Sequence, residues 1–182
     1  MSKISTYGTV TPSPSDLIVV SDANDSKATK NITVGSLSSA TAPSYYIDAF
    51  SNTEATTTIS NVDTYVDLNV SLSQGLADGY TASGNLVTNS NTPQTTLLSK
   101  VTVSMTLSAG NNNVVTSILS NNSVDVVAST QSVTAPASGD DFVLTMTCIT
   151  NLAYNQSLKV RVKNSVATNV VCKHVNFVVH SI

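Results

Sequence analysis

The chain has 182 residues, of which 10% are charged, and it carries a formal net charge of −3 at pH 7. This balance excludes a basic groove for nucleic acid, because basic side chains come together only at Lys159, Arg161 and Lys163. The opening segment MSKISTYGTV lacks the apolar stretch of a signal peptide, and no apolar run reaches the roughly 18 residues of a membrane span, so we expect neither.

The composition is typical of an all-β protein whose surface carries hydroxyl and amide groups rather than charges. Soluble domains have roughly 25% charged residues, far above the 10% here, while Ser, Thr, Asn and Val are abundant. β-Branched side chains fit the pleated surface of a sheet. A chain of this size can form one domain of ordinary size with an extension.

Residues 1–44 are predicted to form an extended attachment arm and linker. TPSPSD favours an extended path, SDANDS indicates a turn, and NITVGSL indicates one short strand that ends at Gly35. The segment buries too little apolar area to order alone, so we expect it to be disordered or laid on a partner. The apolar side chains available for that contact are Leu17, Ile18, Val19, Val20, Ile32 and Val34.

This arm suits attachment by strand addition. The burst LIVV can add a strand to an exposed sheet edge of a neighbouring protein, where main-chain hydrogen bonds supply affinity and alternate side chains set the register. Pro12 and Pro14 restrict the unbound chain, which lowers the cost of ordering it. SLSSATAPS then serves as a flexible tether to the head.

Residues 45–182 are predicted to form a β-sandwich head, because apolar and polar residues alternate in VTVSMTL, FVLTMTC, LKVRVK and VNFVV. In LKVRVK the three basic side chains are expected to face water. The side chains expected to face the core are Val101, Val103, Met105, Leu107, Phe142, Leu144, Met146, Cys148, Leu158, Val160, Val162, Val175, Phe177 and Val179.

Turn clusters separate these strands, and helical periodicity is not sustained anywhere. SAGNNN, SNNS, PASGDD and YNQS are the turns, so the pattern indicates an all-β sandwich or jelly roll. The last strand is expected to be central, since an exposed edge ending in VNFVVHSI would promote aggregation. Strand parity places Cys148 inward and Cys172 outward, so we expect two free thiols rather than a disulfide.

No constellation of side chains predicts catalysis, a cofactor or a metal ion. His174 and His180 lie about 20 Å apart along one extended strand, which is too far for a shared metal ion. Asp140 and Asp141 have the oxygens that calcium prefers, but a turn explains them equally well. No Gly-x-Ser-x-Gly motif occurs, and inward parity argues against a reactive Cys148. We therefore expect no enzyme, no cofactor and no metal site.

The motifs LLSKVTVSMTLSAGNNNVVTSILSNNS, SGDDFVLTMTCITNL, NQSLKVRVKNS and NVVCKHVNFVVHSI resemble the jelly-roll head of the tumour necrosis factor and complement-component superfamily. More closely, they resemble the compact heads of that type in bacteriophage virion proteins. TPSPSDLIVVSDANDSKATKNITVGSL resembles the N-terminal segments of phage head-fibre, decoration and tail-fibre proteins. The resemblance implies a homotrimer with heads around a threefold axis, and it places Val175, Phe177 and Val179 in a core or trimer strand.

The function implied is that of a structural virion protein, either a capsid decoration or a short head fibre, assembled in the host cytoplasm. Its partner would be a capsid or other virion protein bound through residues 1–40, with no nucleic acid and no membrane involved. The alternative is a tail-fibre or receptor-binding component whose head contacts a host surface glycan or protein. The sequence leaves the choice between capsid and tail open.

Overall fold

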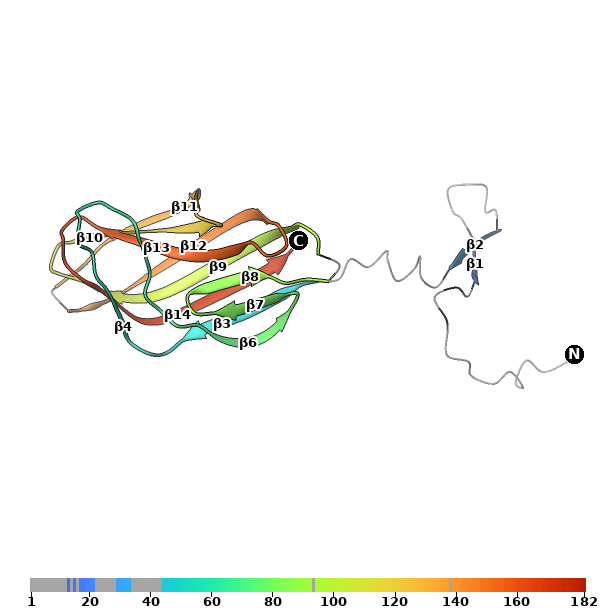
Figure 1. The fold of residues 1–182 in the computed structure, drawn as a ribbon, viewed down its shortest axis with the longest axis horizontal. Coiled ribbons are helices and arrows are strands. Elements are labelled where there is room, and N and C mark those ends of the chain that lie inside the picture. The colour runs from blue at the N-terminus through green and yellow to red at the C-terminus, as the bar shows by residue number, and fades with distance from the viewer. Residues whose placement is uncertain are drawn as a thin grey trace, which may run out of the picture. The chain divides into compact units, whose positions relative to one another are not determined.

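The computed structural model describes residues 13, 15, 17–21, 29–33, 44–92, 94–137 and 139–182. The chain divides into two units, Met1–Pro43 and Ser44–Ile182. Every regular element in the described ranges is a β-strand (Figure 1). Within these ranges no helix has the length and apolar character that crossing a membrane requires.

In the N-terminal unit, β1 (Leu17–Ser21) and β2 (Thr29–Thr33) pair as an antiparallel two-stranded sheet. Leu17 pairs with Thr33 at one end of the ladder and Ser21 with Thr29 at the other. The sequence predicted a strand near NITV and a strand-forming burst at LIVV, and the structure joins the two to each other. Of the predicted arm residues, Val34 lies outside the described residues.

The second unit is a jelly-roll sandwich of two antiparallel sheets, as predicted. One sheet, the β14 sheet, has the strand order β12-β9-β14-β3-β6, with β4 also paired to β14. The other, the β13 sheet, has the order β11-β10-β13-β8-β7, with β5 paired to β13. The strands of the β14 sheet are β3 (Tyr46–Ser51), β4 (Ala55–Thr57), β6 (Ser73–Asp78), β9 (Leu97–Ser108), β12 (Asp141–Leu152) and β14 (Val170–Ser181). The strands of the β13 sheet are β5 (Val66–Asp67), β7 (Tyr80–Ser83), β8 (Leu86–Asn89), β10 (Val114–Asn121), β11 (Val124–Thr134) and β13 (Ser157–Asn164).

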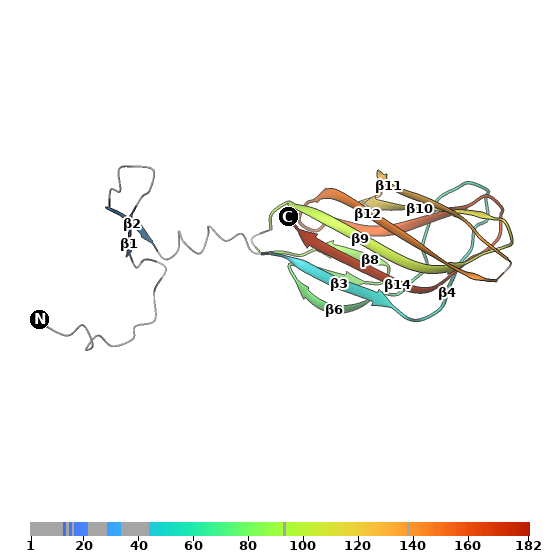
Figure 2. The same ribbon diagram turned by 180° about the vertical axis from the view of Figure 1, so that it is seen from behind.

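The last strand, β14, is central, which confirms the prediction from its apolar sequence. It lies between β9 and β3 and pairs antiparallel with both (Figures 1 and 2). Next to it, β9 and β12 pair without interruption from Ser108 and Asp141 to Leu97 and Leu152. An uninterrupted ladder keeps alternate side chains on one face, so both strands direct the side chains predicted for the core into the sandwich.

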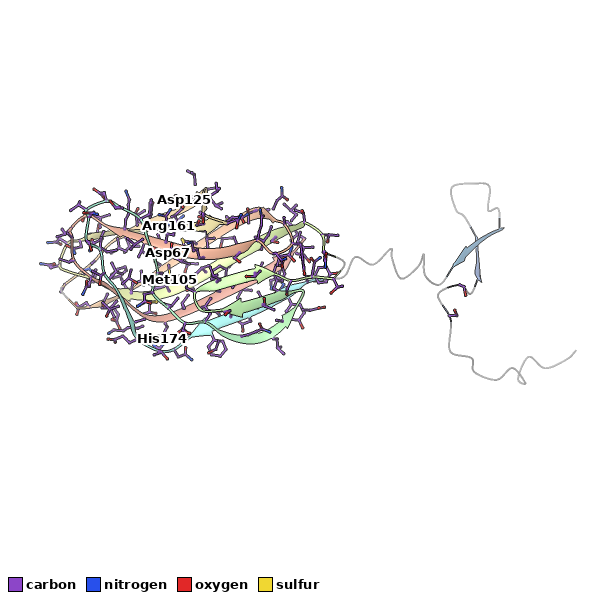
Figure 3. All side chains as sticks on the ribbon, in the orientation of Figure 1. Asp67, Met105, Asp125, Arg161 and His174 are labelled. Carbon is purple, nitrogen blue, oxygen red and sulfur yellow. The ribbon has the colours of Figure 1, made fainter. Side chains whose placement is uncertain are left out.

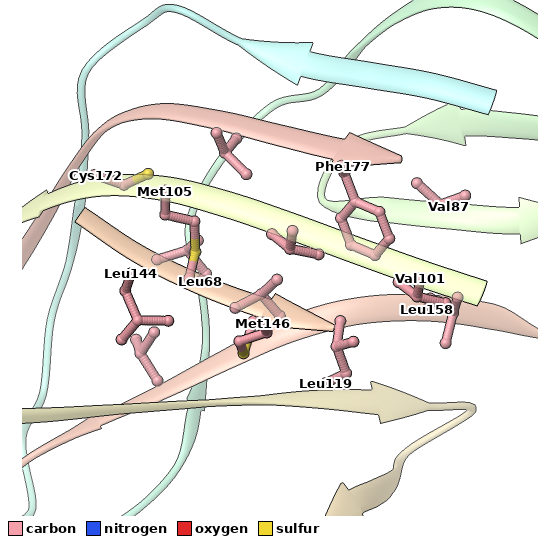
Figure 4. Close-up of a cluster of buried hydrophobic side chains, with 14 of the residues drawn as sticks. Leu68, Val87, Val101, Met105, Leu119, Leu144, Met146, Leu158, Cys172 and Phe177 are labelled. Carbon is pink, nitrogen blue, oxygen red and sulfur yellow. The ribbon is translucent and has the colours of Figure 1, made fainter. Parts of the chain in front are cut away.

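The core lies between the two sheets and is built from these alternating residues (Figure 4). Phe177 of β14 is 1% exposed, and full burial of such a side chain stabilises the fold by about 1.5–3 kcal/mol. All the side chains predicted to face the core are buried. Among the largest that are fully enclosed are Phe177, Ile47, Ile59, Leu68, Met105, Leu107, Leu119, Leu144, Met146, Leu152 and Leu158.

The prediction that Cys172 points outward is wrong. Its side chain is 1% exposed and belongs to the core. The cause is a β-bulge: Cys172 pairs with Leu107 and His174 pairs with Thr106, which leaves Lys173 as an extra residue in β14. A bulge reverses the inward and outward alternation of the side chains that precede it in the strand. Cys148 and Cys172 are both buried free thiols, and burial raises the pKa of Cys172 to about 11.

Candidate interaction surface

On the face of the β14 sheet that points away from the core, the described side chains are all exposed or half-buried. We call this face the outer face. It exposes apolar side chains on β12 and β9, with Val143 62% exposed and Ile149 58% exposed, together with Leu98. The side chains that form it are Val143, Thr145, Thr147, Ile149, Leu98, Lys100, Thr102, Ser104, Thr106, His174, Asn176, Val178, His180, Tyr46, Asp48 and Phe50.

Hydroxyl groups rather than charges occupy the middle of the outer face. Thr102 and Thr147 lie 3.3 Å apart, oxygen to oxygen, across β9 and β12, and Ser104 and Thr145 lie 3.2 Å apart one step along. Hydroxyls bonded to each other need fewer water molecules than charged groups do. Such a face can be desolvated at modest cost, and depletion of charge is what distinguishes the buried centre of protein interfaces.

A groove of about 380 Å³ crosses the outer face where β9, β14 and β3 run side by side. Ser104, Asn176 and Phe50 form one row across the three strands, because Asn176 pairs with both of the others. The other residues that line the groove are Asp48, Asn52, Met105, Thr106, His174 and Val175. Figure 3 locates His174 and Met105 on this sheet.

Two bulges shape the edges of this groove. The extra residue Lys173 sets the direction of His174, which is exposed at one end. In β6, Gly75 and Leu76 together oppose the single residue Asp48 of β3. A Cβ atom on Gly75 would lie 2.9 Å from the carbonyl oxygen of Asp48, so the close approach of the two strands requires glycine there.

The predicted basic stripe of β13 is part of an ion-pair network on the other sheet (Figure 3). Arg161 donates from Nη1 to Asp125 at 2.7 Å and from Nη2 to the carbonyl oxygen of Tyr65 at 2.9 Å. Lys159 Nζ lies 2.6 Å from Asp67 Oδ2. The guanidinium also lies over the ring of Tyr65, 5.7 Å from its centroid. These basic side chains point away from the core. Their positive charges are neutralised by Asp67 and Asp125, so the stripe does not offer an acidic ligand a positively charged surface.

The two histidines and the acidic turn residue Asp141 contact different groups. His180 stacks against Tyr46 with ring centroids 6.2 Å apart, while His174 lies at the groove. Asp141 pairs with Lys173 at 2.7 Å. Among the residues that the structure describes, no group of three His, Cys, Asp or Glu side chains is arranged to hold a metal ion.

The structure distributes the predicted site residues over both units. Leu17, Ile18, Val19 and Val20 lie in β1 and Ile32 lies in β2. Val175, Phe177 and Val179 are buried in the core of their own chain, where their side chains stabilise the sheet behind the outer face. The groove residues of β3 were missed, because no strand was predicted at YIDAFS, although buried Ile47 and Ala49 alternate there with exposed Asp48 and Phe50.

No protein-family model matches the chain, and the comparison with curated proteins finds no match. The second unit is nevertheless similar to solved structures. Murine APRIL at pH 5.0 superposes with a TM-score of 0.55 at 10% sequence identity, covering 77% of this chain and 100% of that one. Eiger TNF from S. frugiperda gives a TM-score of 0.51 at 11% identity, covering 76% and 91%. The PRD1 vertex protein P5 gives 0.46 at 15% identity, covering 76% and 96%.

The likeness to APRIL and Eiger establishes the fold as a TNF-like jelly roll. At 10–11% identity it establishes the fold alone.

Proposed function

We propose that the protein is a structural virion protein, a homotrimeric capsid decoration or short head fibre that is anchored to the particle by residues 1–40. The observation that carries the proposal is the outer face, an exposed and sparsely charged sheet face on a TNF-like head. The virion location rests on the resemblance of the N-terminal sequence to phage fibre and decoration proteins.

Trimerisation would cover the outer face. The exposed Val143 and Ile149 each contribute up to about 1.5–3 kcal/mol when fully buried. The hydroxyl pairs between β9 and β12 satisfy each other, so an approaching subunit need not replace strong hydration there. Closed cyclic symmetry then removes every copy of this face from solvent.

Attachment would use the β1–β2 sheet. A two-stranded sheet is marginally stable by itself, and among the described residues each of its strands leaves one edge unpaired. Pairing with a strand of the particle extends the sheet and satisfies those backbone groups. With three arms on one trimer, the first contact raises the effective concentration of the others, so a weak single arm is sufficient.

The native mass of the full chain in solution tests the first half of the proposal. Light scattering is expected to give about 57 kDa, three times the chain mass of 18.9 kDa. A monomer would contradict the trimer.

Removal of residues 1–40 tests the second half. The shortened chain is expected to keep the far-UV circular dichroism of a β-protein and the trimeric mass, because the second unit has its own core. It should no longer co-sediment with particles that bind the full chain. Attachment at unchanged occupancy would contradict the role of the arm.

A further inference from the structure

The edge strand β11 carries a projection where its pairing with β10 is interrupted. Val126 pairs with Leu119 and Gln131 pairs with Ser117, so the four residues 127–130 oppose the single residue Ile118 of β10. We call residues 127–130 the β11 knob. It projects along one long side of the second unit, and β6 lies on the opposite side (Figures 1 and 2).

Side-chain hydrogen bonds tie the β11 knob to β10 and to the neighbouring residues of β11. Ser129 is 1% exposed, and its Oγ accepts from the backbone N–H of Leu119 at 2.8 Å and donates to the carbonyl oxygen of Val126 at 2.7 Å. Thr130 Oγ1 donates to the carbonyl oxygen of Val127 at 2.8 Å. A projection fixed in this way loses little conformational entropy when it binds.

The tip of the β11 knob is apolar and unusually exposed. Val127 is 76% exposed, and Ala128 beside it is also exposed. The knob carries no charged side chain. A rigid valine at the tip of an edge strand is therefore a surface that water solvates poorly and that a shallow groove can accept.

The groove of the outer face has matching chemistry. Phe50 offers an apolar ring that is 38% exposed, and Asn52, Asn176 and Thr106 offer amide and hydroxyl groups around it. Its charged or titratable side chains are Asp48 and His174. An uncharged knob therefore brings no like charge against the groove, which matters for a chain of net charge −3 meeting its own copy.

We infer that the β11 knob of one copy seats in the outer-face groove of the next copy, an inference that rests on the proposed trimer. Knob and groove lie at different places on one chain, so their contact is heterologous. Heterologous contacts related by a rotation close into a ring, as three copies would. β12 adjoins β11 and carries Val143 and Ile149, so the same approach buries these two side chains.

Full-length Val127→Asp tests the inference, with Val62→Asp as its matched control. Val62 is 52% exposed in the loop between β4 and β5, so the control adds the same charge at another exposed valine. We expect Val127→Asp to raise the concentration at which the trimer dissociates at least tenfold, and Val62→Asp to leave it unchanged. Thermal unfolding followed by circular dichroism checks that the Val127→Asp and Val62→Asp chains both stay folded.

Cysteine cross-linking provides a second measurement. The double variant Val127→Cys with Asn176→Cys is expected to form disulfides between chains under mild oxidation, seen as ladders on non-reducing gels. The pair Val62→Cys with Asn176→Cys is the control and should remain uncross-linked. A trimer that keeps its affinity in Val127→Asp and forms no Val127→Cys cross-link would overturn the knob contact alone. A monomeric wild-type chain would overturn both the contact and the proposed trimer.

Discussion

A pair of glycine substitutions tests how the polypeptide enters the head. Gly79, between β6 and β7, has φ of +72°, and a Cβ atom there would lie 2.3 Å from Cδ1 of Tyr45. Gly84 has φ of +58° and no neighbour within 4 Å of its Cβ position. Both substitutions to alanine impose the same backbone strain, but only Gly79→Ala displaces Tyr45.

The difference between the two variants measures what Tyr45 contributes. Alanine at positive φ costs about 1–2 kcal/mol, which is the whole expected effect of Gly84→Ala. Tyr45 is 8% exposed, and its hydroxyl donates to the carbonyl oxygen of Thr92 at 3.1 Å. Displacing it loses about 1 kcal/mol of hydrogen bonding and about 2 kcal/mol of burial. Gly79→Ala is therefore expected to cost about 4–5 kcal/mol in total.

Urea unfolding of the two variants provides the measurement. The chain has no tryptophan and six tyrosines, so tyrosine fluorescence and far-UV circular dichroism are the suitable signals. The slopes of the unfolding free energy against urea should match the wild type, with the midpoints falling in the order wild type, Gly84→Ala, Gly79→Ala. Equal midpoints for the two variants would show that Tyr45 does not pack against Gly79 and would refute the reasoning.

Two further predictions concern the thiols and the ion-pair network. Because burial raises the pKa of Cys172 to about 11 and also raises that of Cys148, only about one Cys172 in a thousand is a thiolate at pH 8. Ellman's reagent should therefore react at pH 8 far more slowly with the folded chain than with the chain in urea, and equal rates would contradict the burial. Arg161→Ala should lower the free energy of unfolding by about 2 kcal/mol, since it leaves Asp125 and the carbonyl of Tyr65 without their charged donor. Arg161→Lys should recover part of that loss, and an unchanged urea midpoint in Arg161→Ala would show that the network adds no stability.

Strict alternation made the long strands predictable. VTVSMTL and FVLTMTC lie in β9 and β12, which pair in one unbroken register, so period two in the sequence became one buried face in the structure. LKVRVK in β13 behaves in the same way, with Leu158, Val160 and Val162 buried. The central position of β14 could be predicted from its apolar sequence, because an apolar strand at an exposed sheet edge would promote aggregation.

Prediction failed where a strand gains residues relative to its partner. Nothing in VVCKHV marks Lys173 as an extra residue, because its status depends on pairing with β9, far away in the sequence. Parity therefore placed Cys172 on the wrong side. The same limit hid the groove, whose β3 and β6 edge depends on the bulge at Gly75 and Leu76, and the β11 knob, where four residues oppose one.

These bulges lie at or beside the surfaces that the proposed assembly needs, and sheet physics gives a reason. A regular edge strand such as an unbulged β11 would offer a continuous row of N–H and C=O groups to any strand, so pairing would be indiscriminate. Residues 127–130 interrupt that row with a fixed projection that fits a shaped groove but cannot extend a sheet. One irregularity thus opposes aggregation and favours a single partner, which is the combination that a closed ring of identical heads requires. Removing the knob by restoring one-to-one pairing of β11 with β10 should accordingly convert a trimer of defined mass into polydisperse aggregates, measurable by light scattering, whereas a monodisperse trimer would contradict this account.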